Sequence, residues 1–186
     1  SSGGIVCNTL PSAGKALFSE EETDNIGMLP GDTLQRTIWV HNKSTKSCDL
    51  VLSKVENIQY ETGTLSDFST KFWISLIGDG KVVYGGIDSN NEANSAKSLM
   101  DFFNFFNTGS GSTSLPIFSI NANENETHGK PLIWKITFDP QTGNEYQKSK
   151  VWFDFDLTFN CDDNKEVLTP KLGISKYTPN WPNKNN

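Results

Sequence analysis

The chain has 186 residues, 35% of them hydrophobic and 20% charged, which is the size and composition of one globular domain with its own core. Its net charge of −6 argues against nucleic acid as a partner, because the phosphate backbone requires a basic surface. No apolar run is long enough to cross a bilayer, so we expect no membrane span.

Residues 1–15 are expected to form an N-terminal extension. The first residue is Ser and no signal-type apolar stretch follows it, which favours a mature, processed chain. Within the extension, "GGIVCNTL" is short and apolar through Ile5, Val6 and Leu10, and glycines flank it. Two interpretations remain open: the segment is the first strand of its own domain, or it is a strand that one molecule donates to the next.

Alternation with period two predicts strands through the body of the chain. In "TLQRTIWVHN", Ile38 and Val40 lie on one face, while Trp39 and His41 lie on the more polar face. The predicted strands are residues 33–42, 48–55, 71–86 (two strands around the turn Gly78-Asp79-Gly80), 131–138 and 151–159.

One helix is predicted to interrupt these strands, at about Asn94–Asn107. Its apolar residues share a face at helical spacing: Ala96, Leu99, Met100, Phe103 and Phe106, with Phe102 and Phe105 broadening the stripe. We expect this helix to lie over an open end or edge of a sandwich, and "TGSGSTS" after it to be a flexible connection.

The last predicted strand carries Asp154 and Asp156 on the same face, since side chains two residues apart in a strand point the same way. The opposite face of this strand is wholly apolar, which is typical of a half-solvated antiparallel sheet. A general acid–base pair would need one carboxylate in an apolar pocket, and the sequence indicates none. We therefore predict a solvent-facing surface, with a surface calcium site as the alternative.

Strands separated by turn signals, with one helix, predict an all-β antiparallel sandwich. We assign residues 16–175 to this single domain and residues 176–186, rich in Pro and Asn, to an irregular tail.

The three cysteines, Cys7, Cys48 and Cys161, form no C-x-x-C pair, which argues against a zinc or thioredoxin-like site. They allow one disulfide in three possible pairings, or buried free thiols. A single intrachain bridge would best join Cys48 to Cys161, because both lie at strand ends. Cys7, in the candidate donor segment, would instead bridge to Cys48 or Cys161 of a neighbouring molecule.

Three stretches, in order, resemble the TasA/camelysin-like family of surface and biofilm-matrix proteins. They are "MLPGDTLQRTIWVHNKSTKSCDLVLS", "FWISLIGDGKVVYGGIDS" and "GNEYQKSKVWFDFDLTFN", which together span most of residues 28–160. The N-terminal "SSGGIVCNTLPSAGK", the C-terminal tail and the three cysteines depart from the family pattern.

The resemblance implies an exported protein with an Ig-like or jelly-roll-like sandwich, located at the cell surface or in a biofilm matrix. It also implies a fibre in which the N-terminal segment of one subunit adds as a strand to the next, with a possible anchoring protein at the cell surface. We therefore expect a homopolymer whose donor strand contains Ile5, Val6, Cys7 and Leu10.

Two other functions are weighed against this one. Camelysin-like relatives suggest a metalloprotease, but His41 and His128 lie far apart, no H-E-x-x-H helix is present, and both are expected to be solvated surface histidines. A carbohydrate-binding adhesin would need an aromatic platform, for which Trp39, Trp73 and Trp152 are the candidates. We predict no catalytic residue, metal site or cofactor.

Two sequons, at Asn42 and Asn125, are expected in exposed loops and are possible glycosylation sites.

Overall fold

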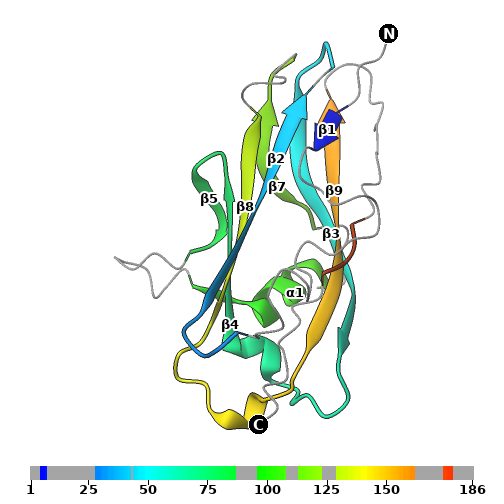
Figure 1. Cartoon of the computed structure of the whole chain (residues 1–186). Coiled ribbons are helices and arrows are strands. Elements are labelled where there is room, and N and C mark those ends of the chain that lie inside the picture. Colours follow the sequence, from blue (N-terminus) through cyan, green and yellow to red (C-terminus); the bar gives the residue numbers. More distant parts are fainter. Residues whose placement is uncertain are drawn as a thin grey trace.

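The structure is a computed structural model, and it describes residues 5–7, 28–42, 44–86, 96–107, 113–122, 129–161 and 174–177. Two antiparallel sheets lie face to face and enclose one core (Figure 1). The prediction of an all-β antiparallel sandwich with one α-helix is confirmed.

The first sheet has the strand order β1-β2-β8-β4-β5, and β6 also pairs with β4. Its strands are β1 (Ile5–Cys7), β2 (Thr33–Asn42), β4 (Phe72–Gly78), β5 (Lys81–Gly85), β6 (Lys97–Ser98) and β8 (Lys130–Phe138). The middle strand β8 pairs with β2 on one side and β4 on the other, although β2 lies about a hundred residues earlier in the chain.

The second sheet has the order β10-β9-β3-β7. Its strands are β3 (Cys48–Tyr60), β7 (Leu115–Ile120), β9 (Val151–Cys161) and β10 (Ile174–Tyr177). Two short 3-10 helices, η2 (Phe68–Lys71) and η3 (Asn144–Tyr146), lie in the connections.

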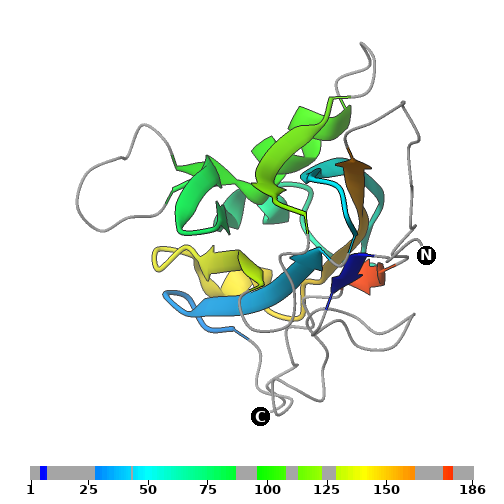
Figure 2. The same cartoon turned by 90° about the horizontal axis from the view of Figure 1, so that it is seen from above.

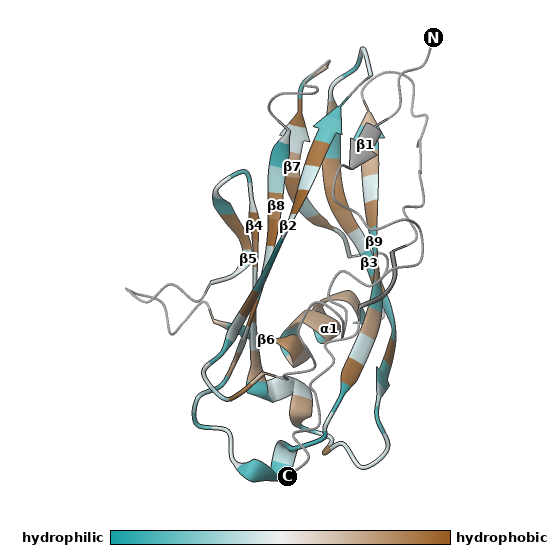
Figure 3. Cartoon of the chain, in the orientation of Figure 1, coloured by the Kyte–Doolittle hydropathy of each residue, from teal (hydrophilic) through white to brown (hydrophobic). Residues whose placement is uncertain are grey.

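The core forms because alternate side chains of each strand face the other sheet. Figure 3 shows this alternation as brown and pale bands along the strands. Trp134 of β8 is 1% exposed, and its ring lies 4.6 Å from that of Phe155 on the opposite sheet. The inward residues of β9 are those expected: Val151, Phe153, Phe155, Leu157 and Phe159. Burial of these large side chains is the main favourable term in folding.

The turn between β4 and β5 has the expected form. Asp79 and Gly80 both have positive φ, at 49° and 78°. Two consecutive residues in this region make the tight turn that matches the twist of a hairpin, and Asp and Gly are among the residues that accept it.

The helix α1 (Leu99–Asn107) begins later than the predicted Asn94, because Ser98 and Asp101 form a capping box. The Asp101 backbone N–H donates to Ser98 Oγ at 3.0 Å, and the Ser98 backbone N–H donates to Asp101 Oδ2 at 2.8 Å. These two bonds satisfy N–H groups that have no partner within the helix.

The helix lies between the two sheets at one end of the sandwich (Figure 1). The ring of Phe102 lies 6.0 Å from Trp134 on the first sheet and 6.3 Å from Phe153 on the second. The helix therefore closes this end from within, which agrees with the expected position at an open end.

Three strands in the described part of the chain went unpredicted, and the two-residue β6 lies within the range that was predicted as helix. β7 contains Pro116, which argues against a central strand, but β7 is an edge strand, where a missing N–H is tolerated. β10 ends at Tyr177, so the expectation of an irregular tail from residue 176 is wrong for its first two residues. Four residues are too few to show a reliable alternation.

Candidate functional site

The N-terminal strand β1 lies at the edge of the first sheet, antiparallel to β2. Its three residues oppose the last three of β2 in the register Ile5 with Asn42, Val6 with His41, and Cys7 with Val40. Figure 2 shows β1 beside β2 and close to β10 of the other sheet. Three of the four candidate donor residues thus pair within their own chain, and Leu10 lies outside the described residues.

Asn42 anchors the end of β2 on which β1 lies. Its side chain is fully buried, and Nδ2 donates to the carbonyl oxygens of Lys46 at 2.7 Å and Asn121 at 3.0 Å, with a longer contact to Ile120 at 3.3 Å. Its Oδ1 accepts from the backbone N–H and the hydroxyl of Ser44, at 2.9 and 2.7 Å.

The expectation that Asn42 is an exposed glycosylation site is therefore wrong. A glycan attaches to Nδ2, and in the folded chain this atom is buried and bonded to carbonyl groups. Asn42 instead joins the end of β2 to the chain that follows β7. The second sequon, Asn125, lies outside the described residues.

A disulfide joins Cys48 to Cys161, with their Cα atoms 3.9 Å apart. The two residues are directly opposed in the β3–β9 ladder. Cys161 ends β9 and Asn42 ends β2, and Figure 1 shows these two strands ending at the same end of the sandwich. This is the intrachain pairing that the strand ends favoured. Because both sulfurs are used, Cys7 cannot bridge to Cys48 or Cys161 of a neighbour while this bond is intact, which removes that proposed covalent link.

His41 is buried, with 7% of its surface exposed, so the expectation of a solvated surface histidine is wrong for it. The reason is the residue across the strand pair. A Cβ on Gly129 would lie 2.6 Å from Cε1 and Nε2 of the imidazole, so the absent side chain makes room for the ring. His128 lies outside the described residues.

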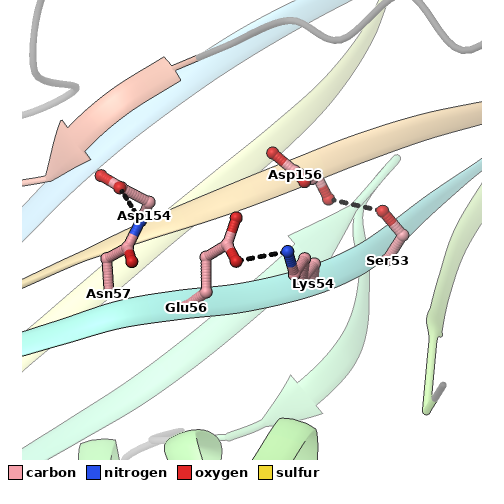
Figure 4. A network of polar contacts seen from close by, with 6 residues as sticks. All are labelled: Ser53, Lys54, Glu56, Asn57, Asp154 and Asp156. Atoms are coloured by element: carbon pink, nitrogen blue, oxygen red, sulfur yellow. Dashed lines mark hydrogen bonds and ion pairs between the residues drawn. The ribbon is translucent and has the colours of Figure 1, made fainter. Parts of the chain in front are cut away.

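Asp154 and Asp156 lie on the outer face of the second sheet, beside polar residues of β3 (Figure 4). Asn57 Nδ2 donates to Asp154 Oδ2 at 2.7 Å. Lys54 opposes Asp156 in the ladder and forms an ion pair with Glu56. The hydrogen bond to Glu56, helped by the negative charges of Glu56 and Asp156, raises the pKa of Lys54 above its usual value. Desolvation acts in the opposite direction and is the smaller effect.

The rest of this face is also polar. Ser53 Oγ lies 2.7 Å from Thr158 Oγ1 and donates to the backbone oxygen of Asp156 at 3.2 Å. Trp152 Nε1 donates to Gln59 Oε1 at 2.7 Å. The two aspartates therefore belong to the solvent-facing surface of a strand, as predicted. Within the described ranges, no three His, Cys, Asp or Glu side chains are grouped so as to hold a metal ion.

The three candidate tryptophans do not form one platform. Trp39 and Trp73 both lie on the outer face of the first sheet, opposite Pro131 and Thr137 of β8. These partners are six residues apart in a strand, a separation of about 20 Å. Trp152 lies on the outer face of the other sheet, so no glycan ring could stack on all three.

The opposite end of the sandwich is held by a residue that the sequence reasoning did not single out. Tyr146 is 8% exposed, and its hydroxyl donates to Asp67 Oδ2 at 2.6 Å. This bond, together with burial and the nearby charge of Asp67, raises the pKa of Tyr146 to about 12. Its ring stacks on that of Phe68 at 6.0 Å, which ties η3 to η2.

Comparison with protein-family models gives no match, and no curated protein matches the sequence significantly. Of the helices in the described part of the chain, none has the length and apolarity needed to cross a membrane.

Proposed function

We propose that this chain is the structural subunit of an extracellular filament or matrix fibre, and that it assembles head to tail by exchange of its N-terminal strand. One observation carries the proposal. The strand β1 is only three residues long, lies at a sheet edge, and pairs with β2, which the chain reaches only after residues 8–27.

Such a strand is well suited to exchange. The same three residues can form the same backbone hydrogen bonds with β2 of a second copy, as in domain swapping. The connection of residues 8–27 reaches at most about 70 Å when extended, which is ample to join two copies. The other strands of the first sheet pair with one another independently of β1.

The direction of exchange determines the kind of assembly. When each copy donates β1 to the next and accepts β1 from the previous one, donor and acceptor surfaces differ, so the contact repeats without closing. The product is a linear homopolymer, ended by an anchoring protein at the cell surface.

Two further features support an exported fibre protein. The Cys48–Cys161 disulfide is typical of proteins from oxidising compartments outside the cytosol. The three motif stretches resemble the TasA/camelysin-like family, which favours an Ig-like or jelly-roll-like form of the sandwich and a place at the cell surface or in a biofilm matrix.

The register of β1 supplies a direct test. Cys7 lies opposite Val40, so V40C places a second thiol across the strand pair, in the same relation as the native Cys48 and Cys161. I38C is the matched control: Ile38 lies on the same face of β2 and is equally buried, but no described residue of β1 opposes it.

Both variants are concentrated, oxidised and run on non-reducing gels, with negative-stain microscopy of the same samples. Exchange predicts regular fibres and, for V40C alone, a ladder of covalent multimers that collapses under reductant. Peptide mapping then identifies the bond from Cys7 to the introduced thiol. A V40C sample that remains monomeric at high concentration, with this bond inside one chain, would refute the proposal.

A further inference from the structure

Two of the sheet edges carry features that resist the addition of a strand. β7 contains Pro116, which lacks an N–H, and its register with β3 shifts between Leu50 and Val51. β5 is five residues long, has a shift in its register with β4, and ends at Gly85, whose φ is +62°. Proline, short length and bulges are the usual protections of exposed edges.

The edge of β9 lacks these protections. β10 pairs with β9 only at Phe153 and Phe155, so Leu157–Cys161 has β3 on one side and, within the described residues, no strand on the other. Its pairing with β3 is regular, from Leu52 opposite Leu157 to Cys48 opposite Cys161. The segment contains no Pro and no charged residue, and the disulfide fixes its end.

We propose that Leu157–Cys161 of β9 is a second acceptor edge, which pairs with the N-terminal strand donated by another copy of this chain. The inference rests on the proposed strand exchange. The donated strand would then lie between β2 and β9 and join the two sheets along one side of the sandwich.

The strand directions fit this arrangement. Figure 1 shows β2 and β9 running the same way, and β1 is antiparallel to β2, so a strand in the place of β1 is antiparallel to β9 as well. Figure 2 shows that this place lies next to β10. Because β10 is also antiparallel to β9, the added strand would continue the line of β10 along the same edge.

The second edge gives the exchange a driving force. Exchange of β1 alone reproduces on a neighbour the pairing with β2 that β1 already makes at home, so it changes the free energy little. An equilibrium shifts only through contacts that differ between its two states. At home β1 pairs with β2 alone among the described strands, so the contacts of a donated strand with β9 would be new and would favour the exchanged state.

Backbone amide hydrogen exchange, compared between monomer and fibre of the full chain, tests this inference. Residues along a strand alternate between its two neighbours, so about half of the amides of Leu157–Cys161 point away from β3. We expect these amides to exchange at least about tenfold more slowly in the fibre. The amides of β7 (Leu115–Ile120), at an edge protected by Pro116, are the internal control and should not change.

The outcomes separate this inference from the function on which it rests. Absence of fibres, or an intrachain bond only in V40C, overturns the strand exchange and this inference with it. Fibres that carry the intermolecular Cys7 bond, but whose Leu157–Cys161 amides exchange as fast as in the monomer, overturn the second edge alone. Slower exchange confined to β7 would do the same.

Discussion

Replacing Asn42 with alanine is expected to destabilise the fold by about 3 kcal/mol, because its buried side chain makes four hydrogen bonds of ordinary length at one end of the sandwich. The amide is fully buried and holds the carbonyl groups of Lys46 and Asn121, which belong to different loops. The Lys46 carbonyl also accepts from Ser44 Oγ at 2.9 Å, so it keeps one side-chain partner in the variant.

The magnitude follows from the individual bonds. Two donated bonds at 2.7 and 3.0 Å and two accepted bonds at 2.9 and 2.7 Å are of ordinary length, whereas the contact with Ile120 at 3.3 Å is long. Each ordinary bond contributes about 1 kcal/mol net. Ser44 and Lys46 can recover part of the loss because they are partly or fully exposed, which reduces the sum to about 3 kcal/mol.

The assay is reversible unfolding of the oxidised protein by urea and by heat. For a domain of this size, a loss of about 3 kcal/mol lowers Tm by roughly 6 to 12 °C. N104A is the matched control, since Asn104 is exposed on α1 and alanine favours a helix, so its stability should change by less than about 0.5 kcal/mol. A loss below about 1 kcal/mol for N42A would refute the role assigned to this side chain.

Three further outcomes are expected. G129A should destabilise the protein by about 1 to 3 kcal/mol, because its Cβ would lie 2.6 Å from the His41 ring. In the H41A background the same substitution should cost much less, and equal losses in both backgrounds would show that the two residues are not in contact. C48A combined with C161A should lower the free energy of unfolding by up to about 5 kcal/mol, since the bond closes a long loop; equal stability of variant and wild type in urea would contradict this. The pKa of Tyr146 is raised to about 12 in the folded state, so its contribution to the free energy of unfolding is fully present below about pH 10 and is lost as the pH rises through about 12. Y146F should lose less stability than wild type over this alkaline range, and identical pH profiles would show that the bond to Asp67 is not the cause of the loss.

Alternation of apolar and polar residues predicted the strands well, because each strand of this sandwich has one buried and one solvated face. The range 33–42 is β2 to the residue, and Asp79-Gly80 forms the expected hairpin turn. The pairing of strands was not predictable in this way. β8 joins β2 and β4 across large sequence separations, and nothing in a single sequence marks which strands meet.

The expectations for His41 and Asn42, at the end of β2, were wrong for the same reason: residues far away in the sequence determine the burial of both side chains. Alternation assigns His41 to the outer face, but it cannot show that the opposing residue is a glycine that leaves room for the ring. The N-x-S pattern of Asn42 also describes a turn in which the Asn side chain bonds to the residue two positions later, as it does with Ser44. The hydrogen bonds from Asn42 to the distant carbonyl groups of Ile120 and Asn121 favour the turn over the glycosylation site, and such distant contacts cannot be predicted from the local sequence.

The start of the helix, by contrast, was readable. Ser98-x-x-Asp101 has the spacing of a capping box, with Asp in place of the usual Glu, directly before an apolar run. Counting Ala96 with the apolar stripe obscured this signal and placed the start too early.

The distribution of stabilising contacts explains how a strand can leave without unfolding the domain. One end of the sandwich is held by the Cys48–Cys161 bond and Asn42, and the other by α1 and the Tyr146–Asp67 bond. β8 pairs along its length with strands on both sides, while β1 pairs through three residues on one side. Local opening is easiest where pairing is shortest and at an edge. Release of β1 should therefore cost far less free energy than global unfolding, so that exchange proceeds between folded molecules. Its rate should be nearly independent of Y146F, which weakens the opposite end of the sandwich.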